Sequence, residues 1–181
     1  MSNFLDCLLQ DVIVTGRQSR CLLLLRTLFV AQAGYRVMLR FRLAQYLQQR
    51  GYRVGAKLVI RSIESKFGVY IGLKTKIGSG VKLPHPVGIV IGAGVEIDQG
   101  CIIYQNVTLG GARDGDALRS AYPKIGKDVC IFAGAVIIGD VSVGAGSVVG
   151  ANSVVTANMP QKSVIVGAPA RAVKCRGDVV A

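Results

Sequence analysis

Small or branched apolar residues recur at every sixth position across most of this chain. A period of six fits neither an α-helix, which repeats every 3.6 residues, nor a single strand, which alternates every two. It is typical of a solenoid in which each turn consists of three short flat segments joined by tight corners. We therefore predict an all-β solenoid over residues 69–174. The series runs Ile71, Ile77, Leu83, Ile89, then Ile91, Ile97, Ile103, Leu109, and finally Ile125, Ile131, Ile137, Val143, Val149, Val155.

Two interruptions of the repeat mark a candidate site. The first is a two-residue slip at residues 88–92, directly after His85, which is the only histidine of the chain. The second is the segment 110–124, which is polar and rich in glycine and cannot supply inward aliphatic side chains. We expect this segment to leave the solenoid as a loop. Because ligand contacts gather on loops that project from a rigid repeat scaffold, His85 and this loop are the first candidates for function.

Residues 1–68 are predicted to form a helical cap. Apolar residues recur at helical spacing from Tyr35 to Arg50 and again from about Ala56 to Phe67, with Gly34 and Gly51 as breaks. Such a cap would protect the open edge of the first coil. The apolar run 22–33 is shorter than the roughly 20 residues of a membrane span. Since residues 17–61 are rich in arginine, we also expect peripheral contact between this segment and an anionic membrane surface.

The composition agrees with a solenoid and argues against a nucleic-acid-binding protein. Only 6% of the residues are aromatic, Trp is absent and Gly occurs 23 times, which suits flat aliphatic layers with glycine at the corners. The net charge of +12 is spread along the chain, without a zinc finger, an RNA-binding sheet signature or a basic arm. We therefore expect no nucleic-acid partner. Residues 163–171 are expected to form a final strand that folds back, and residues 175–181 a tail.

The five cysteines include no CxxC pair, and nothing resembles a secretory cleavage site. We expect reduced thiols in a cytoplasmic protein, with any membrane contact peripheral and at the inner face. Cys101 and Cys130 fall within the repeat and are interpreted as small packing residues.

Four motifs in a fixed order give the chain a family resemblance: 88–92 (GIVIG), 105–111 (QNVTLGG), 123–126 (PKIG) and 166–171 (VGAPAR). With them the chain resembles the left-handed parallel β-helix acyltransferases, and more narrowly the serine acetyltransferases and their relatives that acetylate polysaccharide precursors. The resemblance implies a left-handed coil, a homotrimer with active sites in the clefts between subunits, and acetyl-CoA as co-substrate without a metal.

The resemblance also assigns roles to individual residues. His85 would be the general base, a role that suits imidazole because its pKa lies near working pH. Backbone N–H groups of Gly110 and Gly111 would be oxyanion or cofactor donors. The pantetheine arm of coenzyme A would lie along Ala133, Gly134 and Ala151, and its phosphates would reach Arg171 and Lys174. Further candidates for orienting His85 or binding substrate are Tyr70, Gln105, Arg119 and Tyr122.

The chain departs from serine acetyltransferases at the positions that hold the amino acid. Tyr70 stands where the family has the carboxylate that orients the histidine, and Pro84, Ala93 and Ala121–Tyr122 replace further charged residues. Each lost charged hydrogen bond would remove about 1.5–3 kcal/mol of affinity for serine. We therefore predict that the acceptor is a sugar hydroxyl on a precursor of a surface polysaccharide.

Two alternatives remain open. The first is a serine acetyltransferase of cysteine biosynthesis with an altered pocket. The second, of another class, is a non-catalytic trimeric scaffold, for which Tyr70 is the best support. A carbonic anhydrase built on a β-helix is excluded because it needs three histidines on zinc, and the chain has one.

Overall fold

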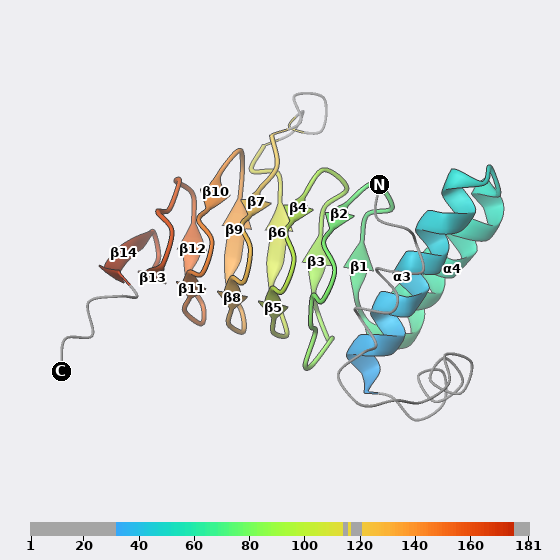
Figure 1. The fold of residues 1–181 in the computed structure, drawn as a ribbon, viewed down its shortest axis with the longest axis horizontal. Coiled ribbons are helices and arrows are strands. Elements are labelled where there is room, and N and C mark those ends of the chain that lie inside the picture. Colours follow the sequence, from blue (N-terminus) through green and yellow to red (C-terminus); the bar gives the residue numbers. More distant parts are fainter. Residues whose placement is uncertain (1–31, 114–115, 117–120, 176–181) are drawn as a thin grey trace.

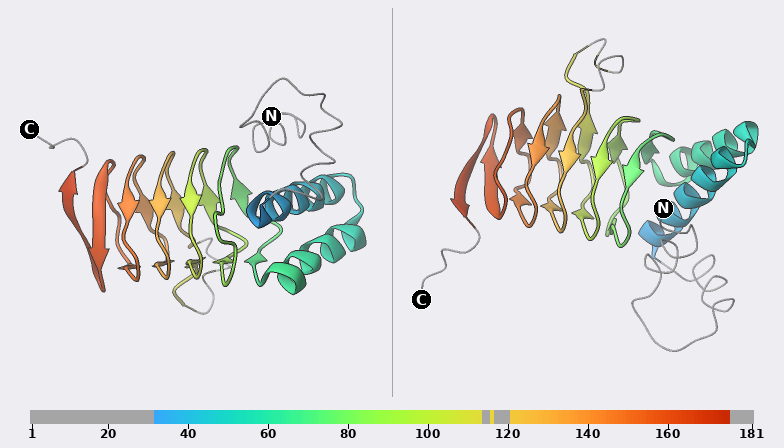
Figure 2. Two further views of the ribbon diagram at one scale, coloured as in Figure 1. Left: turned by 90° about the horizontal axis from the view of Figure 1, so that it is seen from below. Right: turned by 45° about the horizontal axis from the view of Figure 1, so that its top comes forward.

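The computed structural model describes residues 32–113, 116 and 121–175 (Figure 1). It begins with two helices, α3 (Ala33–Gln49) and α4 (Arg53–Phe67), and continues as a stack of short strands. The helices lie at one end of the stack and the C-terminal strands at the other (Figure 2). The helical structure expected before residue 32 and the tail after residue 175 fall outside the described residues.

The strands form three sheets, which are the three faces of a prism. Neighbouring strands are parallel within each sheet, except for the last two, β13 and β14, which are antiparallel. Sheet A contains β1 (Tyr70–Ile71), β3 (Val90–Ile91), β6 (Thr108–Gly110), β9 (Val136–Ile138) and β12 (Val154–Val155). Sheet B contains β2 (Lys76–Ile77), β4 (Glu96–Ile97), β7 (Lys124–Ile125) and β10 (Ser142–Val143). Sheet C contains β5 (Ile102–Ile103), β8 (Cys130–Ile131), β11 (Val148–Val149), β13 (Ser163–Gly167) and β14 (Ala170–Cys175).

The predicted six-residue repeat is confirmed by the strand register. In sheet A the inward residues stack as Ile71, Ile91, Leu109, Ile137 and Val155, one from each coil, and all are buried. The other two sheets stack their inward residues in the same way. Each coil therefore adds one aliphatic layer to a continuous core, and apolar burial of this kind is the main stabilising term of the solenoid.

The sequence placed the two-residue irregularity of the repeat at residues 88–92, which include β3. In the structure, the two additional residues lie in the corner before β3. Ile89 is buried, but it belongs to a second inward row with Val69 and Val107 rather than to the six-residue series. Lys82 pairs with Ile102, and Asn106 donates its N–H to the carbonyl of Val87. Four residues, 84–87, thus fill the space that two residues, 104–105, fill one coil later. The longer corner carries His85.

The corners between sheet C and sheet A form a column along the prism, which we call the C–A corner; it comprises residues 84–88, 104–107, 132–135 and 150–153. One residue in each of these turns is left-handed: Gly88, Asn106, Gly134 and Asn152 have φ of 65°, 57°, 73° and 56°. A Cβ on Gly88 would clash with the side-chain Oδ1 of Asn106 as it now lies, so glycine leaves room for that amide on the next coil.

Helix α3 caps the first coil through close backbone contact and buried hydrogen bonds. Gly34, which we expected to break the helical pattern, lies in the first turn of α3. Glycine is needed there because a Cβ would clash with the carbonyl oxygen of Leu83, against which the helix packs. The buried guanidinium of Arg42 donates to the carbonyls of Ile77 and Gly78, both at 2.6 Å. These bonds satisfy carbonyl groups at the edge of the prism that have no further coil to pair with. Among the described residues, neither helix has the length and apolar character to cross a membrane.

Candidate active site

His85 projects from the C–A corner into solvent. Pro84 is half-buried and Pro86 is buried, so the prolines on both sides anchor the corner and the imidazole between them is exposed. The carbonyl of His85 accepts a hydrogen bond from the N–H of Val87 at 2.8 Å, which closes a tight turn. The two additional residues of this corner thus place an exposed imidazole on this edge of the prism.

Tyr104, which sequence reasoning missed, is the aromatic neighbour of His85. Their ring centroids are 6.4 Å apart with the planes tilted by 43°. Tyr70, which the sequence resemblance placed at the position of an orienting carboxylate, lies on β1 in sheet A beside Val90 and is 47% exposed. The sequence signal for Tyr104 is its position directly after the inward residue Ile103. That position lies in the C–A corner, one coil after the turn that carries His85.

Several predicted cofactor residues share this corner with His85. The N–H of Gly134 donates to the carbonyl of Gln105, and the N–H of Asn152 donates to the carbonyl of Ala133, both at 3.0 Å. These bonds align Gln105, Ala133 and Ala151 on successive coils. Oε1 of Gln105 is buried and has no hydrogen-bond partner among the described residues, so it can accept a bond from a ligand. The column of small residues leaves room for a narrow extended chain.

The loop residues Gly110 and Gly111 lie on a different edge, between sheets A and B. The carbonyl of Gly110 accepts from the N–H of Gly139 at 3.0 Å, and Gly111 is exposed. Oδ2 of Asp116 accepts from the N–H groups of Ala112 and Arg113 at 2.7 and 2.8 Å, which closes the start of the loop. The face of sheet A therefore separates these two glycines from His85 within one chain.

Tyr122 is also separate from His85. Its half-buried ring packs over Gly92 and Gly94, and a Cβ on Gly94 would lie 2.0 Å from the ring atom Cδ2. Tyr122 is thus a packing residue that needs glycine opposite it. Arg119 falls outside the described residues.

Arg171 lies at the far end of the prism on β14. Its side chain is exposed, and Nη1 donates to the carbonyl of Ala170 at 3.0 Å. Lys174 is on the same strand, but its side chain falls outside the described part of the structure. At about 5 Å per strand, five strand steps separate β14 from the coil of His85 by roughly 25 Å. Only a long ligand could span both.

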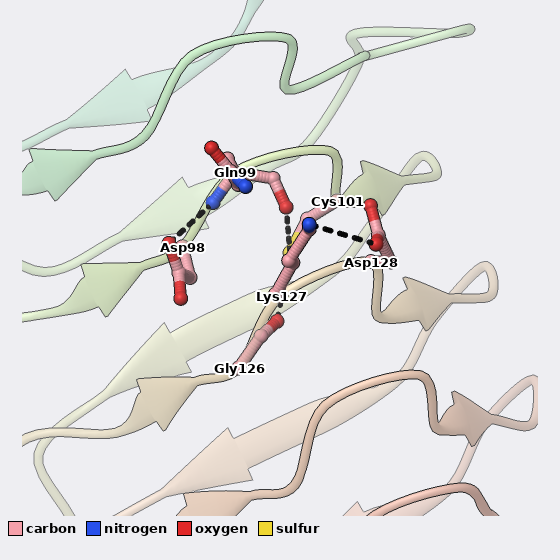
Figure 3. A network of polar contacts seen from close by, with 6 residues as sticks. All are labelled: Asp98, Gln99, Cys101, Gly126, Lys127 and Asp128. Atoms are coloured by element: carbon pink, nitrogen blue, oxygen red, sulfur yellow. Dashed lines mark hydrogen bonds and ion pairs between the residues drawn. The ribbon is translucent and has the colours of Figure 1, made fainter.

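A polar network on the corners between sheets B and C lies apart from these residues (Figure 3). There the thiol of Cys101 donates to the carbonyl of Gly126 at 3.2 Å. Burial raises the pKa of Cys101 to about 11, so the thiol stays protonated at neutral pH. Cys101 therefore acts as a packing residue, as expected, and is no nucleophile.

Known proteins resemble this chain in sequence and in structure. Residues 122–157 match the family model "Bacterial transferase hexapeptide (six repeats)". The serine acetyltransferase of Buchnera aphidicola subsp. Acyrthosiphon pisum is 39% identical over 140 residues, which are 77% of this chain and 51% of that protein. The Escherichia coli K12 serine acetyltransferase is 37% identical over 140 residues, covering 77% and 50%.

Solved structures extend the match to nearly the whole chain. A serine acetyltransferase in complex with CoA superposes with a TM-score of 0.79 at 32% identity, covering 94% of this chain and 69% of that one. The soybean serine acetyltransferase apoenzyme gives the same TM-score, identity and coverage. The left-handed β-helix is thereby confirmed. The chain spans about half the length of the curated relatives that it matches.

These relatives overturn the prediction that the acceptor is a sugar of a surface-polysaccharide precursor. That prediction gave five substituted positions more weight than the match of the remaining chain. The structure gives one of the five, Tyr122, a packing role: its ring lies on Gly94, so this exchange carries no information about a sugar.

Proposed function

We propose that this chain, which belongs to the hexapeptide-repeat acyltransferases and within them to the serine acetyltransferase homologues, moves an acetyl group from acetyl-CoA to the hydroxyl of serine. The observation that carries the proposal is the exposed His85, alone of its kind in the chain, on an extended corner of a solenoid that matches serine acetyltransferases. The chain spans about half of its curated relatives, so the activity is taken from the site and not from a match of whole proteins.

In the proposed reaction, His85 takes the proton of the serine hydroxyl as the oxygen attacks the thioester carbonyl. The exposed backbone N–H of Gly111 stabilises the developing oxyanion, whereas Gly110 is paired with Ile138 of β9 within sheet A. The C–S bond then breaks, and the thiolate of coenzyme A takes the proton from the imidazolium. N–H groups of Ala112 and Arg113 are left out of this role because the carboxylate of Asp116 already occupies them.

Acetyl-CoA is proposed to lie along the C–A corner. The small side chains of Ala133 and Ala151 and the unpartnered Oε1 of Gln105 support this path, because a pantetheine arm is narrow and carries amide N–H groups. Arg171, roughly 25 Å from His85, is a proposed phosphate contact at the far end of such a long ligand. No cluster of metal ligands occurs among the described residues, and the proposed reaction uses none.

A homotrimer is proposed because the two halves of the site lie on different edges of one prism. His85 is on the C–A corner, whereas Gly110 and Gly111 are on the edge between sheets A and B. A closed ring of three prisms would bring one edge of each subunit against another edge of its neighbour. The proposed site would therefore be completed across the subunit contact.

The test is acetyl-CoA-dependent thiol release by the purified protein with and without serine. Serine is expected to stimulate release, and His85→Ala is expected to lower kcat by about 10²–10⁴-fold, because a positioned base contributes that much. Lys57→Ala, on the exposed surface of α4, is the control and should keep the wild-type rate. A wild-type protein that serine does not stimulate overturns the proposal. Serine-dependent release that His85→Ala leaves unchanged would overturn the role of His85 as the base, and the absence of turnover in both proteins would favour the non-catalytic scaffold.

Contact of residues 17–61 with an anionic membrane stays a prediction. The two described helices with their connection, residues 32–67, carry one acidic residue, Glu64, against many basic ones, and Tyr52, Val54 and Leu58 are exposed. This surface supports the prediction through charge complementarity with anionic lipid. Residues 17–31 lie outside the part of the chain that the structure describes. A cytoplasmic location likewise stays an expectation.

A further inference from the structure

An exposed general base needs something that holds its ring in one orientation. The carboxylate that does this in the family is replaced by Tyr70, which stands on sheet A with a 47% exposed side chain. A histidine on a surface corner loses rotamer freedom only if a neighbour restricts it, and an imprecise base is a slow one. The residue that borders the imidazole is Tyr104, with ring centroids 6.4 Å apart.

Tyr104 is itself held in place by a second ring. It stacks on Phe132 with centroids 5.1 Å apart and planes within 6° of parallel. The two residues are equivalent on successive coils, because each directly follows an inward isoleucine, Ile103 or Ile131, and these two isoleucines are paired in sheet C. The spacing of adjacent strands, about 4.8 Å, is close to the stacking distance, so the fold imposes the stack.

The stack stands at the surface of the site rather than in the core. Phe132 is 41% exposed, Tyr104 is half-buried, and His85 is exposed. The N–H of Tyr104 donates to the carbonyl of Ile131 at 3.0 Å, and the N–H of Phe132 donates to that of Val149 at 2.9 Å. The backbone of both aromatic residues is therefore held in place by hydrogen bonds to the next coil. Because the two rings are partly exposed, they are not needed to fill the core of the prism.

We propose that Tyr104, supported by Phe132, is the positioning residue for His85 and takes over the orienting role that a carboxylate has in the family. The proposal rests on the proposed function, since orientation matters only if His85 is the base. The aromatic ring acts through shape: it blocks the rotamers in which the imidazole would swing toward the second coil. The phenol hydroxyl is not required.

Three variants with two readouts test the proposal. Tyr104→Leu removes the ring, Tyr104→Phe keeps it, and Phe132→Leu removes its support. We expect Tyr104→Leu to lower kcat for serine acetylation about tenfold with KM for acetyl-CoA within twofold of wild type, and Phe132→Leu to lower kcat by a smaller factor. Tyr104→Phe should stay within twofold of wild type. Tyr52→Leu, on an exposed tyrosine of the helical end, is the control and should leave kcat unchanged.

The second readout does not depend on activity. Because His85 is the only histidine, its imidazole C–H resonances report one site in the NMR spectrum. The neighbouring ring should shift them, and we expect this shift in wild type and Tyr104→Phe but not in Tyr104→Leu. Far-UV circular dichroism and size-exclusion chromatography confirm that each variant keeps its fold.

Each possible result decides between the hypotheses. An active wild type whose kcat and imidazole resonances are unchanged by Tyr104→Leu overturns the positioning role and leaves the proposed function intact. A Tyr104→Phe variant as slow as Tyr104→Leu also overturns it, because the hydroxyl would then be the acting group. A wild type without serine-dependent turnover overturns the proposed function and, with it, the catalytic meaning of the ring contact.

Discussion

At the scale of single residues, burial separates the side chains that can react from those that only pack. His85 stands exposed on a lengthened corner, whereas Cys101 is fully buried just before β5, where sheet B turns into sheet C. The thiol donates to the carbonyl of Gly126, and desolvation disfavours its charged form. The raised pKa of the Cys101 thiol should be measurable in the pH dependence of stability.

The raised pKa of Cys101 predicts a loss of stability at alkaline pH. Below pH 9.0 the thiol is neutral in the folded and the unfolded state, so its full contribution is present. Between pH 9.0 and about 11 the unfolded thiol ionises and the folded one does not, so the free energy of unfolding falls. At about 1.4 kcal/mol per pKa unit, the complete loss over these two units is roughly 3 kcal/mol, reached above pH 11.

Urea unfolding from pH 8 to pH 11 checks this. The stability difference between wild type and Cys101→Ala should shrink over that range. Val129→Ala is the matched control, since Val129 fills the same inward position one coil later and cannot ionise. A Cys101→Ala difference that stays as constant with pH as the Val129→Ala difference would contradict the prediction.

The sequence pointed to His85 as a candidate site residue but not to Tyr104, and the reason is physical. A lone imidazole next to an interruption of the repeat is visible in the sequence. The contact with Tyr104 joins two coils, and it depends on where the additional residues of the corner are placed. The structure puts them before Gly88 and not in the strand after it, which decides the ring that faces the imidazole.

At the scale of elements, the loop between β6 and β7 is fixed at both ends by contacts that the sequence does not reveal. Asp116 holds its start through two backbone N–H groups, and Tyr122 holds its end by packing on Gly94. The repeat predicted that this segment leaves the solenoid. It could not predict these anchors, because both join residues that are far apart in the pattern or lie outside it.

The packing of Tyr122 on Gly94 predicts a coupled pair of substitutions. Gly94→Ala places a methyl group where the ring lies and should lower the free energy of unfolding by about 1–3 kcal/mol. In Gly94→Ala/Tyr122→Ala the clash is gone, so the coupling energy should be about 1–2 kcal/mol. Gly110→Ala is the control for stability, because a Cβ there meets nothing within 4 Å. Additive effects in this double-mutant cycle would show that the ring does not rest on Gly94.

The helical cap shows the same limit of sequence reasoning. Helical spacing predicted helices near residues 35–50 and 56–67, and the structure has α3 and α4 there. Gly34 was expected to end a helix because glycine is a weak helix former. The structure keeps it inside α3 because only glycine allows the helix to approach the carbonyl of Leu83. A tertiary contact thus outweighed the local preference.

At the scale of the whole molecule, the fold follows from the period because every coil repeats the same burial. The site does not follow, because its proposed halves lie on two edges of the prism. His85 and Gln105 share the C–A corner, whereas Gly111 and Asp116 lie beyond the face of sheet A. A single chain therefore places the candidate base on one edge and the candidate backbone donors on another, and in the proposed trimer the subunit contact would join them.

Mixed trimers test this arrangement directly. Subunits with His85→Ala keep the loop but lack the base, and subunits with Asp116→Ala keep the base but lose the carboxylate that closes the loop. Each variant alone is expected to be at least tenfold less active than wild type. If each site takes His85 from one subunit and the loop from the next, co-expression in equal amounts restores about a quarter of the sites, because that fraction pairs two intact halves.

The mixture must be compared with the two variants purified separately and combined after assembly. That control contains the same subunits without mixed trimers and should give only the average of the two residual rates. Sedimentation equilibrium establishes that the co-expressed protein is trimeric. A trimeric co-expressed protein no more active than the control would place the base and the loop of each site in one chain, and would contradict the shared site, since random assembly must form mixed rings.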